Sequence, residues 1–197
     1  MMMDLWIFQT GLTRSYHSTK GVRQIVLNMI LSTRRTLRLD DTIVIDSREK
    51  ERAIKLIKKY FDDNKINYIS SKLFCGDYQF LSNGNRVVDR KQNLSELCQN
   101  VCQDHDRFRR ELVRAQENRI QLIILCEHGK DIECLEDIIF WENPRLKKSP
   151  KATTGQTLYN ILSTLKRKYG VQFEFCTKDQ TGKRIIELLG ENNGKKD

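Results

Sequence analysis

The chain has 197 residues, and its 35 Lys and Arg side chains against 26 Asp and Glu give a formal net charge of +9. A chain of this length buries a hydrophobic core without disulfides, and its positive charge favours a polyanionic partner such as nucleic acid. No apolar stretch reaches the roughly 20 residues that span a bilayer, so the sequence argues against a membrane partner.

Residues 1–40 differ from the rest of the chain, because no acidic residue stands between Leu5 and Leu39 while Arg, Lys, Ser and Thr are frequent. This composition predicts a basic, poorly ordered N-terminal appendage. Three alternatives stay open: a mitochondrial presequence, a basic arm that lies along DNA, and a start site at Met29. Residues 41–190 predict one α/β domain, and residues 191–197 a polar tail.

The domain begins with an apolar, β-branched run over Thr42–Asp46, which predicts a buried strand that ends on a carboxylate. Asp46 or Ser47 is then predicted to cap a helix over 49–61, whose apolar residues recur at helical spacing. A short strand over 66–69 leads into the most informative stretch of the chain.

That stretch predicts a β-hairpin. Tyr78–Leu81 and Arg86–Lys91 are β-prone, and Ser82–Asn85 between them supplies the Gly and Asn that a tight turn needs. Because side chains alternate along a strand, Asp89 and Lys91 are expected on one face and Arg90 on the other.

Asp77 begins the first strand of this hairpin and is expected near Asp89 and Lys91. Two carboxylates beside a lysine predict a divalent-metal site with a cation next to it. Such a site suits phosphodiester hydrolysis, which uses hard oxygen ligands and positive charge near the phosphate.

Two helices are predicted after the hairpin, one from Asn93 or Ser95 through Cys102 and one over 107–118. On the second, Arg107, Arg110 and Arg114 form a basic stripe at i, i+3 and i+7. Such a stripe contacts phosphates or is simply a solvated face, and the residues leave both interpretations open.

The remaining elements alternate as an α/β fold requires. A central strand over 120–126 ends at Glu127, a strand-end acid that is also a candidate for supporting the site. A short helix over 132–140 and a proline-containing loop over 141–154 follow, and then a helix over 156–169, a strand over 171–175 and a last helix around 181–189. The loop carries Lys147, Lys148 and Lys151, which contact DNA or solvent.

None of the six cysteines stands in a Cys-x-x-Cys pair, and Cys98, Cys102 and His105 have no fourth ligand at a zinc-site spacing. Cys126 and Cys176 lie in apolar runs, where a free cysteine packs as a small core residue. The cysteines are therefore predicted to be reduced thiols in a reducing compartment.

Asp77 followed by Asp89-x-Lys91 resembles the PD-(D/E)xK nuclease pattern. More narrowly, Gly76-Asp77-Tyr78 followed by Asp89-Arg90-Lys91 resembles the GD…ERK signature of the XPF-type structure-specific endonucleases, and Asp46-Ser47-Arg48-Glu49 resembles their V-x-D-x-R-E segment. Asp89 stands where the family has glutamate, and Ser95 where it usually has aspartate.

This resemblance implies a restriction-endonuclease-like fold with a central mixed β-sheet flanked by helices. It implies Mg²⁺, with Mn²⁺ as a substitute, held by Asp77, Asp89 and Asp46. It implies a catalytic set that also contains Lys91, Arg90 and Glu49. In this set Lys91 positions the attacking water or stabilises negative charge in the transition state.

The predicted function is a metal-dependent DNA endonuclease that acts on branched or structured DNA in repair or recombination. The alternative is a catalytically silent DNA-binding or partner-docking module of the same fold. A nucleotide-using enzyme is disfavoured, because no Gly-x-Gly-x-x-Gly or Walker-type loop follows a strand. The family implies a homodimer or a partner subunit. The expected location is the cytoplasm for a prokaryotic or viral protein and the nucleus for a eukaryotic one.

Overall fold

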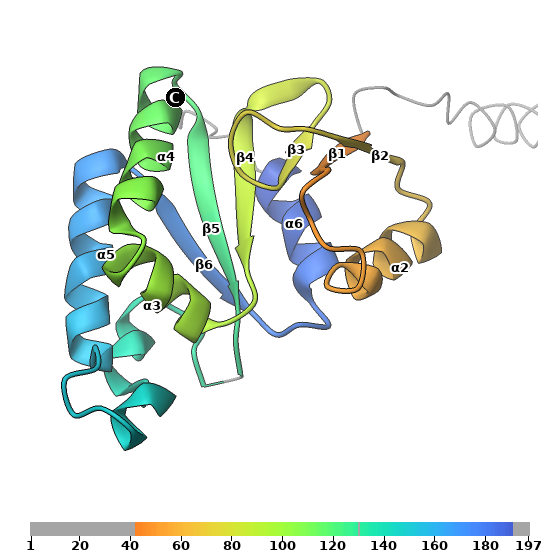
Figure 1. Ribbon diagram of the computed structural model, residues 1–197. Coiled ribbons are helices and arrows are strands. Elements are labelled where there is room, and N and C mark those ends of the chain that lie inside the picture. Colours follow the sequence, from red (N-terminus) through yellow and green to blue (C-terminus); the bar gives the residue numbers. More distant parts are fainter. Residues whose placement is uncertain (1–41, 130, 191–197) are drawn as a thin grey trace, which may run out of the picture. The chain divides into compact units, whose positions relative to one another are not determined.

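The computed structural model describes residues 42–129 and 131–190 (Figure 1). The predictions made for residues 1–40 and 191–197 lie outside the described residues. None of the helices within 42–129 and 131–190 is long and apolar enough to cross a bilayer.

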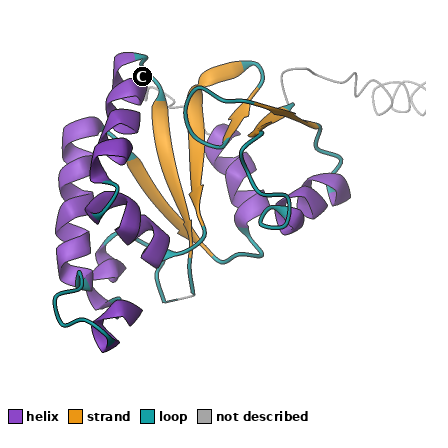
Figure 2. Ribbon diagram, viewed as in Figure 1, coloured by secondary structure: helices purple, strands orange, loops and turns teal. Residues whose placement is uncertain are grey.

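A six-stranded sheet in the order β2-β1-β3-β4-β5-β6 forms the centre of the domain (Figure 2). Three pairs are parallel, β1 with β2, β4 with β5 and β5 with β6, while β3 runs antiparallel to both β1 and β4. The predicted mixed sheet is therefore confirmed. The strands are β1 (Ile43–Asp46), β2 (Tyr68–Ser71), β3 (Tyr78–Phe80), β4 (Asn83–Lys91), β5 (Gln121–Glu127) and β6 (Gln172–Cys176).

Helices cover both faces of the sheet, as Figure 1 shows. One face carries α3 (Leu94–Cys102), α4 (His105–Glu117) and α5 (Gly155–Tyr169). The other carries α2 (Lys55–Asp63) and α6 (Thr181–Gly190), which pack on each other. Two short 3-10 helices, η2 (Glu136–Phe140) and η3 (Pro144–Lys147), precede α5.

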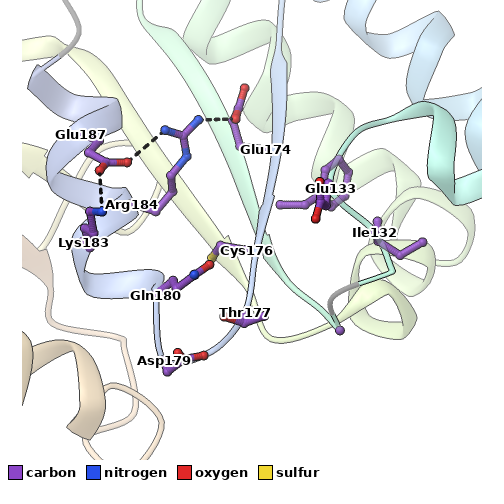
Figure 3. Close-up of a pocket in the computed structure, with 12 residues that line it drawn as sticks. Ile132, Glu133, Glu174, Cys176, Thr177, Asp179, Gln180, Lys183, Arg184 and Glu187 are labelled. Atoms are coloured by element: carbon purple, nitrogen blue, oxygen red, sulfur yellow. Dashed lines mark hydrogen bonds and ion pairs between the residues drawn. The ribbon is translucent and has the colours of Figure 1, made fainter.

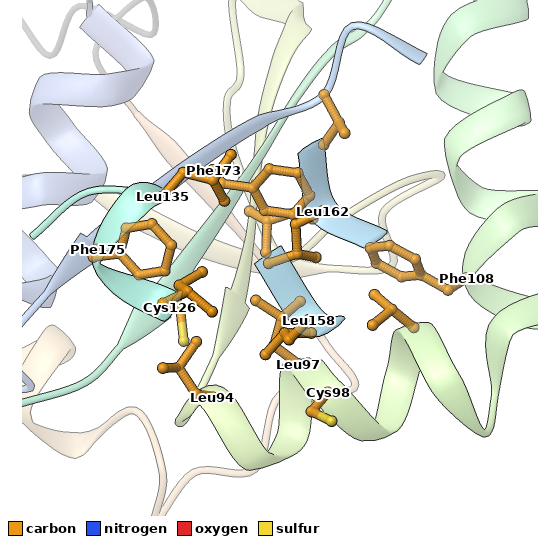
Figure 4. Packing of buried hydrophobic residues seen from close by; sticks show 14 of the residues in the cluster. Leu94, Leu97, Cys98, Phe108, Cys126, Leu135, Leu158, Leu162, Phe173 and Phe175 are labelled. Atoms are coloured by element: carbon orange, nitrogen blue, oxygen red, sulfur yellow. The ribbon is translucent and has the colours of Figure 1, made fainter. Parts of the chain in front are cut away.

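Each face of the sheet has its own hydrophobic core. Under α3, α4 and α5, the buried side chains include Leu97, Phe108 and Leu162, which pack with Phe173 of β6 (Figure 4). Under α2 and α6, a second cluster is formed by Ile43, Ile45, Phe61, Tyr78, Val88, Ile123 and Ile185. Because full burial of one such side chain is worth about 1.5–3 kcal/mol, the two cores hold the central strands β4 and β5 firmly in place.

Helix α2 begins later than its sequence pattern predicts, at Lys55 rather than at residue 49. Asp46 Oδ1 accepts a hydrogen bond from the Arg48 backbone N at 2.7 Å, and Asp46 O accepts one from the Glu49 N at 3.1 Å. These bonds close a turn that competes with the first turn of a helix. The side chain predicted to cap a helix therefore caps a turn.

Other boundaries also differ from the predicted ones. The short helix predicted over 132–140 is only the 3-10 helix η2, which begins at Glu136. Strand β2 covers 68–71 rather than 66–69. Strand β4 begins at Asn83, inside the predicted turn, because a register shift between Gln79 and Phe80 brings Phe80 opposite Asn83. The predicted loop over 141–154 contains η3, which Asn143 caps by accepting a hydrogen bond from the Arg145 N.

Candidate active site

The C-terminal end of β4 brings the predicted core residues together. Asp77 N donates to the Val88 carbonyl at 2.9 Å, and Asp77 Oδ2 accepts from the Arg90 N at 2.8 Å. This pairing places Asp77 beside Asp89 and Lys91, and all three line a cavity of about 500 Å³. The predicted grouping of two carboxylates and a lysine is therefore present in the structure.

The two carboxylates destabilise each other as anions. Burial and the neighbouring charge of Asp89 raise the pKa of Asp77 well above its ordinary value. Asp89 Oδ2 is buried and has no hydrogen-bond partner in the described part of the chain. A buried carboxylate oxygen without a donor is costly, and a cation beside the pair would relieve both effects.

Lys91 already supplies part of this positive charge. Its Nζ donates to Asp89 Oδ1 at 2.7 Å, and both side chains are buried. Burial alone lowers the pKa of Lys91, but Asp89 and Asp77 outweigh burial and raise it above the ordinary value. Lys91 is therefore a protonated donor at neutral pH, and it does not act as a base there.

Arg90 points to the opposite face of β4, as the alternation of the strand predicts, although Arg90 and Glu49 also border the cavity of the carboxylates. Its guanidinium lies between two carboxylates, with Nη2 at 2.9 Å from Glu49 Oε2 and Nη1 at 3.1 Å from Glu127 Oε1. Tyr78 also donates to Glu49, at 3.3 Å. Burial lowers the pKa of Arg90, but the negative charge of Glu49 and of the other groups around it outweighs burial and raises the pKa above its ordinary value. This network ties β4 to β5 and to the turn after β1.

Asp46 does not line the cavity, although its backbone N bonds to the Asp77 carbonyl at 2.8 Å. Both of its oxygens are occupied: Oδ1 accepts from Arg48, and Oδ2 accepts from Arg48 and from the Leu73 N. Burial raises the pKa of Asp46, but these hydrogen bonds outweigh it and lower the pKa. The geometry therefore favours a supporting role for Asp46 over the metal-ligand role that the sequence suggested.

Gly76 allows the backbone before Asp77 to lie against β4. Its φ is +63°, and a Cβ there would overlap Val87 Cγ1 and lie 3.1 Å from the Val88 carbonyl oxygen. A side chain at this position is thus excluded both by conformation and by space.

We expect Gly76→Ala to lower the free energy of unfolding by about 2 kcal/mol, because the new methyl group forces β4 and the Asp77 strand apart. Urea denaturation measures the loss. Gly84→Ala in β4 is the matched control, since its Cβ would meet only Gln79 Oε1 at 3.9 Å. Equal stability of the two variants would contradict the close packing at Gly76.

The predicted basic residues separate into two groups. Arg107, Arg110 and Arg114 of α4 line the same cavity as the carboxylates. Lys147 and Lys148 are exposed at η3 and do not line it, while Lys151 lines a different pocket of about 300 Å³ together with Ser95. Only the arginine stripe is therefore placed beside the acidic pair.

Glu111 is a cavity residue that the sequence did not single out as a site residue. Its Oε1 accepts from the Gly76 N at 3.2 Å, and burial together with Asp89 raises its pKa. Its signal was its spacing, because Glu111 stands four residues after Arg107 and three before Arg114, on the same face of α4. Glu111 therefore adds a carboxylate from α4 to the predicted pair, and Glu49 and Glu96 line the same cavity.

The donor set fits a hard divalent cation. Mg²⁺ is usually held by one or two carboxylates, and water completes its coordination. Asp77 and Asp89 meet this requirement, and the unpartnered Asp89 Oδ2 is a free ligand oxygen. No group of three His, Cys, Asp or Glu side chains within 42–129 and 131–190 is arranged to hold a metal.

Another cavity lies away from these residues. It measures about 590 Å³ and is lined by residues of β6, α6 and the segment before η2 (Figure 3). In it Arg184 bridges Glu174 and Glu187, at 2.6 and 3.1 Å. It contains none of the predicted site residues.

Comparison with known proteins identifies the family. The ERCC4 domain family model matches residues 45–189. Among solved structures, XPF from Aeropyrum pernix matches with a TM-score of 0.55 and 19% identity over 75% of this chain and 63% of that one. The structure of that XPF in complex with DNA matches with a TM-score of 0.55 and 20% identity over 76% and 63%. This chain therefore spans less than two thirds of the length of either XPF chain.

A comparison with curated proteins returned no match. The family match covers every strand except the first residues of β1, and it contains Asp46, Asp77, Asp89 and Lys91. The chain belongs to the ERCC4 domain family, and its described domain has the fold of an XPF-type nuclease.

Proposed function

We propose that this chain is a metal-dependent endonuclease that hydrolyses phosphodiester bonds of branched or structured DNA in repair or recombination. The observation that supports this most strongly is the placement of Asp77, Asp89 and Lys91 at the end of β4, in a cavity bordered by the arginines of α4.

Each group of the site has a chemical role in such a reaction. Asp77 and Asp89 would hold Mg²⁺ or Mn²⁺, which supplies Lewis-acid stabilisation of the phosphate and activation of a water molecule when bound. Lys91, held protonated by Asp89, donates to the oxygen on which negative charge develops. Arg90 and Glu49 keep the end of β4 in place through their ion pair.

The positive charge of the chain and its similarity to XPF support DNA binding. The net charge is +9, and the arginine stripe lies along the cavity that holds the carboxylates. The matched XPF structure was solved in complex with DNA. Lys147, Lys148 and Lys151 stay predicted contacts farther along the DNA. A homodimer or a partner subunit would extend the DNA-binding surface.

Replacing Arg107, Arg110 and Arg114 together with alanine is expected to weaken DNA binding and to flatten its salt dependence. Each lost phosphate contact lowers the slope of log K against log salt by about 0.9. Fluorescence anisotropy at several salt concentrations measures the slope. The matched control replaces Lys166, Arg167 and Lys168 with alanine. These residues are exposed at the end of α5, and their replacement removes the same amount of positive charge. Equal effects of the two triple variants would show that α4 contributes only net charge.

The direct test incubates the chain with labelled flap, fork, bubble and linear duplex DNA, in Mg²⁺, in Mn²⁺ and in EDTA. Asp77→Ala and Lys91→Ala variants are run in parallel. Metal-dependent cutting of the branched substrates, lost in both variants, is the expected result.

A silent DNA-binding module is the second candidate. It is favoured by the absence of a three-ligand metal group within the described residues and by the ion pair that already joins Lys91 to Asp89. DNA binding without cutting in Mg²⁺ and in Mn²⁺ would support this candidate and exclude the endonuclease.

A further inference from the structure

An exposed aromatic ring lies at the cavity that holds the carboxylates. Phe74 belongs to the connection between β2 and β3, which passes in front of β4 toward α4 in Figure 1. Phe74 stands three residues before Asp77, and 59% of its surface is exposed. It is the only large apolar side chain among the residues that line this cavity.

The ring is held in place by the arginine stripe. The Arg114 guanidinium lies over the Phe74 ring, 5.3 Å from its centroid, and Arg114 Nη1 donates to the Phe74 carbonyl at 3.3 Å. A cation over an aromatic face is attractive, so this contact orients the ring. The exposure of Phe74 shows that most of its surface still meets solvent.

The surroundings of the ring are those of a nucleic-acid surface. Arg48, Arg107 and Arg110 line the same cavity and supply positive charge for phosphates. Proteins that bind single strands combine such charge with aromatic rings on which bases stack. A base inside an intact duplex keeps both faces covered by its neighbours, so only an unpaired or flipped base can use the ring.

We propose that Phe74, oriented by Arg114, is a stacking site for an unpaired nucleobase beside the phosphate to be cut. This inference rests on the proposed function and adds to it a physical basis for preferring branched DNA. The ring lies with the carboxylate pair in one cavity, so a base stacked there places its own backbone near Asp77 and Asp89. A protein docked on Phe74 would instead block this cavity, which disfavours a protein ligand.

The test is a double-mutant cycle of DNA-binding affinities, measured in EDTA so that the DNA stays intact. Wild-type chain and Phe74→Ala are titrated with flap DNA that carries either normal or abasic nucleotides at the unpaired positions next to the junction. Removing the ring or the base is expected to weaken binding about tenfold, since stacking contributes roughly 1–3 kcal/mol per base. Removing both is expected to cost no more than removing one, because the ring and the base contact each other.

Two variants serve as controls. Phe74→Tyr keeps an aromatic ring and is expected to retain wild-type affinity. Phe140→Ala removes a ring that is 82% exposed but does not line the cavity, and it is expected to leave binding of both DNA forms unchanged. Binding of linear duplex by Phe74→Ala is expected to equal that of the wild type.

The outcomes separate this inference from the proposed function. If wild type binds flap DNA and Phe74→Ala binds it equally well, or if the losses from ring and base simply add, the stacking site is excluded while the nuclease proposal stands. If wild-type chain binds none of the DNA forms, both are excluded.

Discussion

Asp77→Asn is expected to abolish DNA cleavage and at the same time to stabilise the fold. The amide oxygen can still accept the hydrogen bond from the Arg90 N, which is 2.8 Å long in the wild type. The negative charge beside Asp89 is lost, however, and with it one of the two carboxylates that would hold the metal. Because metal catalysis of this kind supplies several kcal/mol, we expect cleavage to fall by roughly 10³-fold.

The gain in stability has a defined dependence on pH. Burial and Asp89 raise the pKa of Asp77 in the folded chain, so the folded chain keeps this proton where the unfolded chain loses it. The resulting stabilisation is complete below the ordinary Asp pKa of about 4 and is lost as pH rises through the folded value. Asparagine has no proton to lose. Asp77→Asn should therefore be more stable than wild type by about 1 kcal/mol at pH 7, with no gain below about pH 4.

Urea denaturation in EDTA at both pH values measures this difference. Asp63→Asn is the control, because Asp63 is exposed in α2 and pairs with the exposed Lys59. Its stability and cleavage should stay at wild-type values. Wild-type cleavage by Asp77→Asn would exclude the proposed site, and a loss of stability at pH 7 would contradict the repulsion between Asp77 and Asp89.

Arg90→Met is expected to produce the largest loss of stability among single substitutions near the site. Arg90 is 4% exposed, and its guanidinium is the cation that Glu49 and Glu127 share. Methionine fills much of the volume but leaves Glu127 buried without its ion pair. Removal of one partner from a buried ion pair costs about 3–5 kcal/mol, so we expect a decrease of this size in the free energy of unfolding.

The cost should come from the unpaired carboxylates rather than from lost packing. Adding Glu49→Gln and Glu127→Gln to Arg90→Met is therefore expected to recover part of the stability. Lys59→Met breaks an exposed pair and should change stability by less than about 0.5 kcal/mol. A loss below about 1 kcal/mol in Arg90→Met would show that the network contributes little. Urea denaturation of the four proteins decides between these results.

Local sequence rules predicted the centre of the site well. The two-residue period of a strand predicted Asp89 and Lys91 on one face and Arg90 on the other. The side chains of β4 follow this prediction. The predicted hairpin is present, but its turn lies at Leu81 and Ser82, and Gly84 with its Asn neighbours belongs to β4. The order of the motifs, more than any one of them, indicated the family that the comparison confirmed.

The sequence could not place the residues whose surroundings depend on long-range contacts. Asp46 looked like a ligand, but its oxygens are occupied by Arg48 and by the backbone of Leu73, a residue far along the chain. Phe74 comes to the cavity from a loop, and no local pattern signals that approach. Glu111 is signalled only by its spacing relative to the arginines of α4. Lys147 and Lys148 do not line the cavity, because charge alone does not fix position, and they stay predicted DNA contacts away from it.

Binding of Mn²⁺ tests most directly whether Asp77 and Asp89 together hold a divalent ion. Wild-type chain is titrated with Mn²⁺ in the absence of DNA, with free Mn²⁺ followed by electron paramagnetic resonance, and the titration is repeated with Asp77→Asn and with Asp89→Asn. The predicted result is Mn²⁺ binding by the wild type that is lost in both variants, with Asp63→Asn unchanged. Equal Mn²⁺ binding by all four proteins, or none by the wild type, would contradict a metal site at the end of β4.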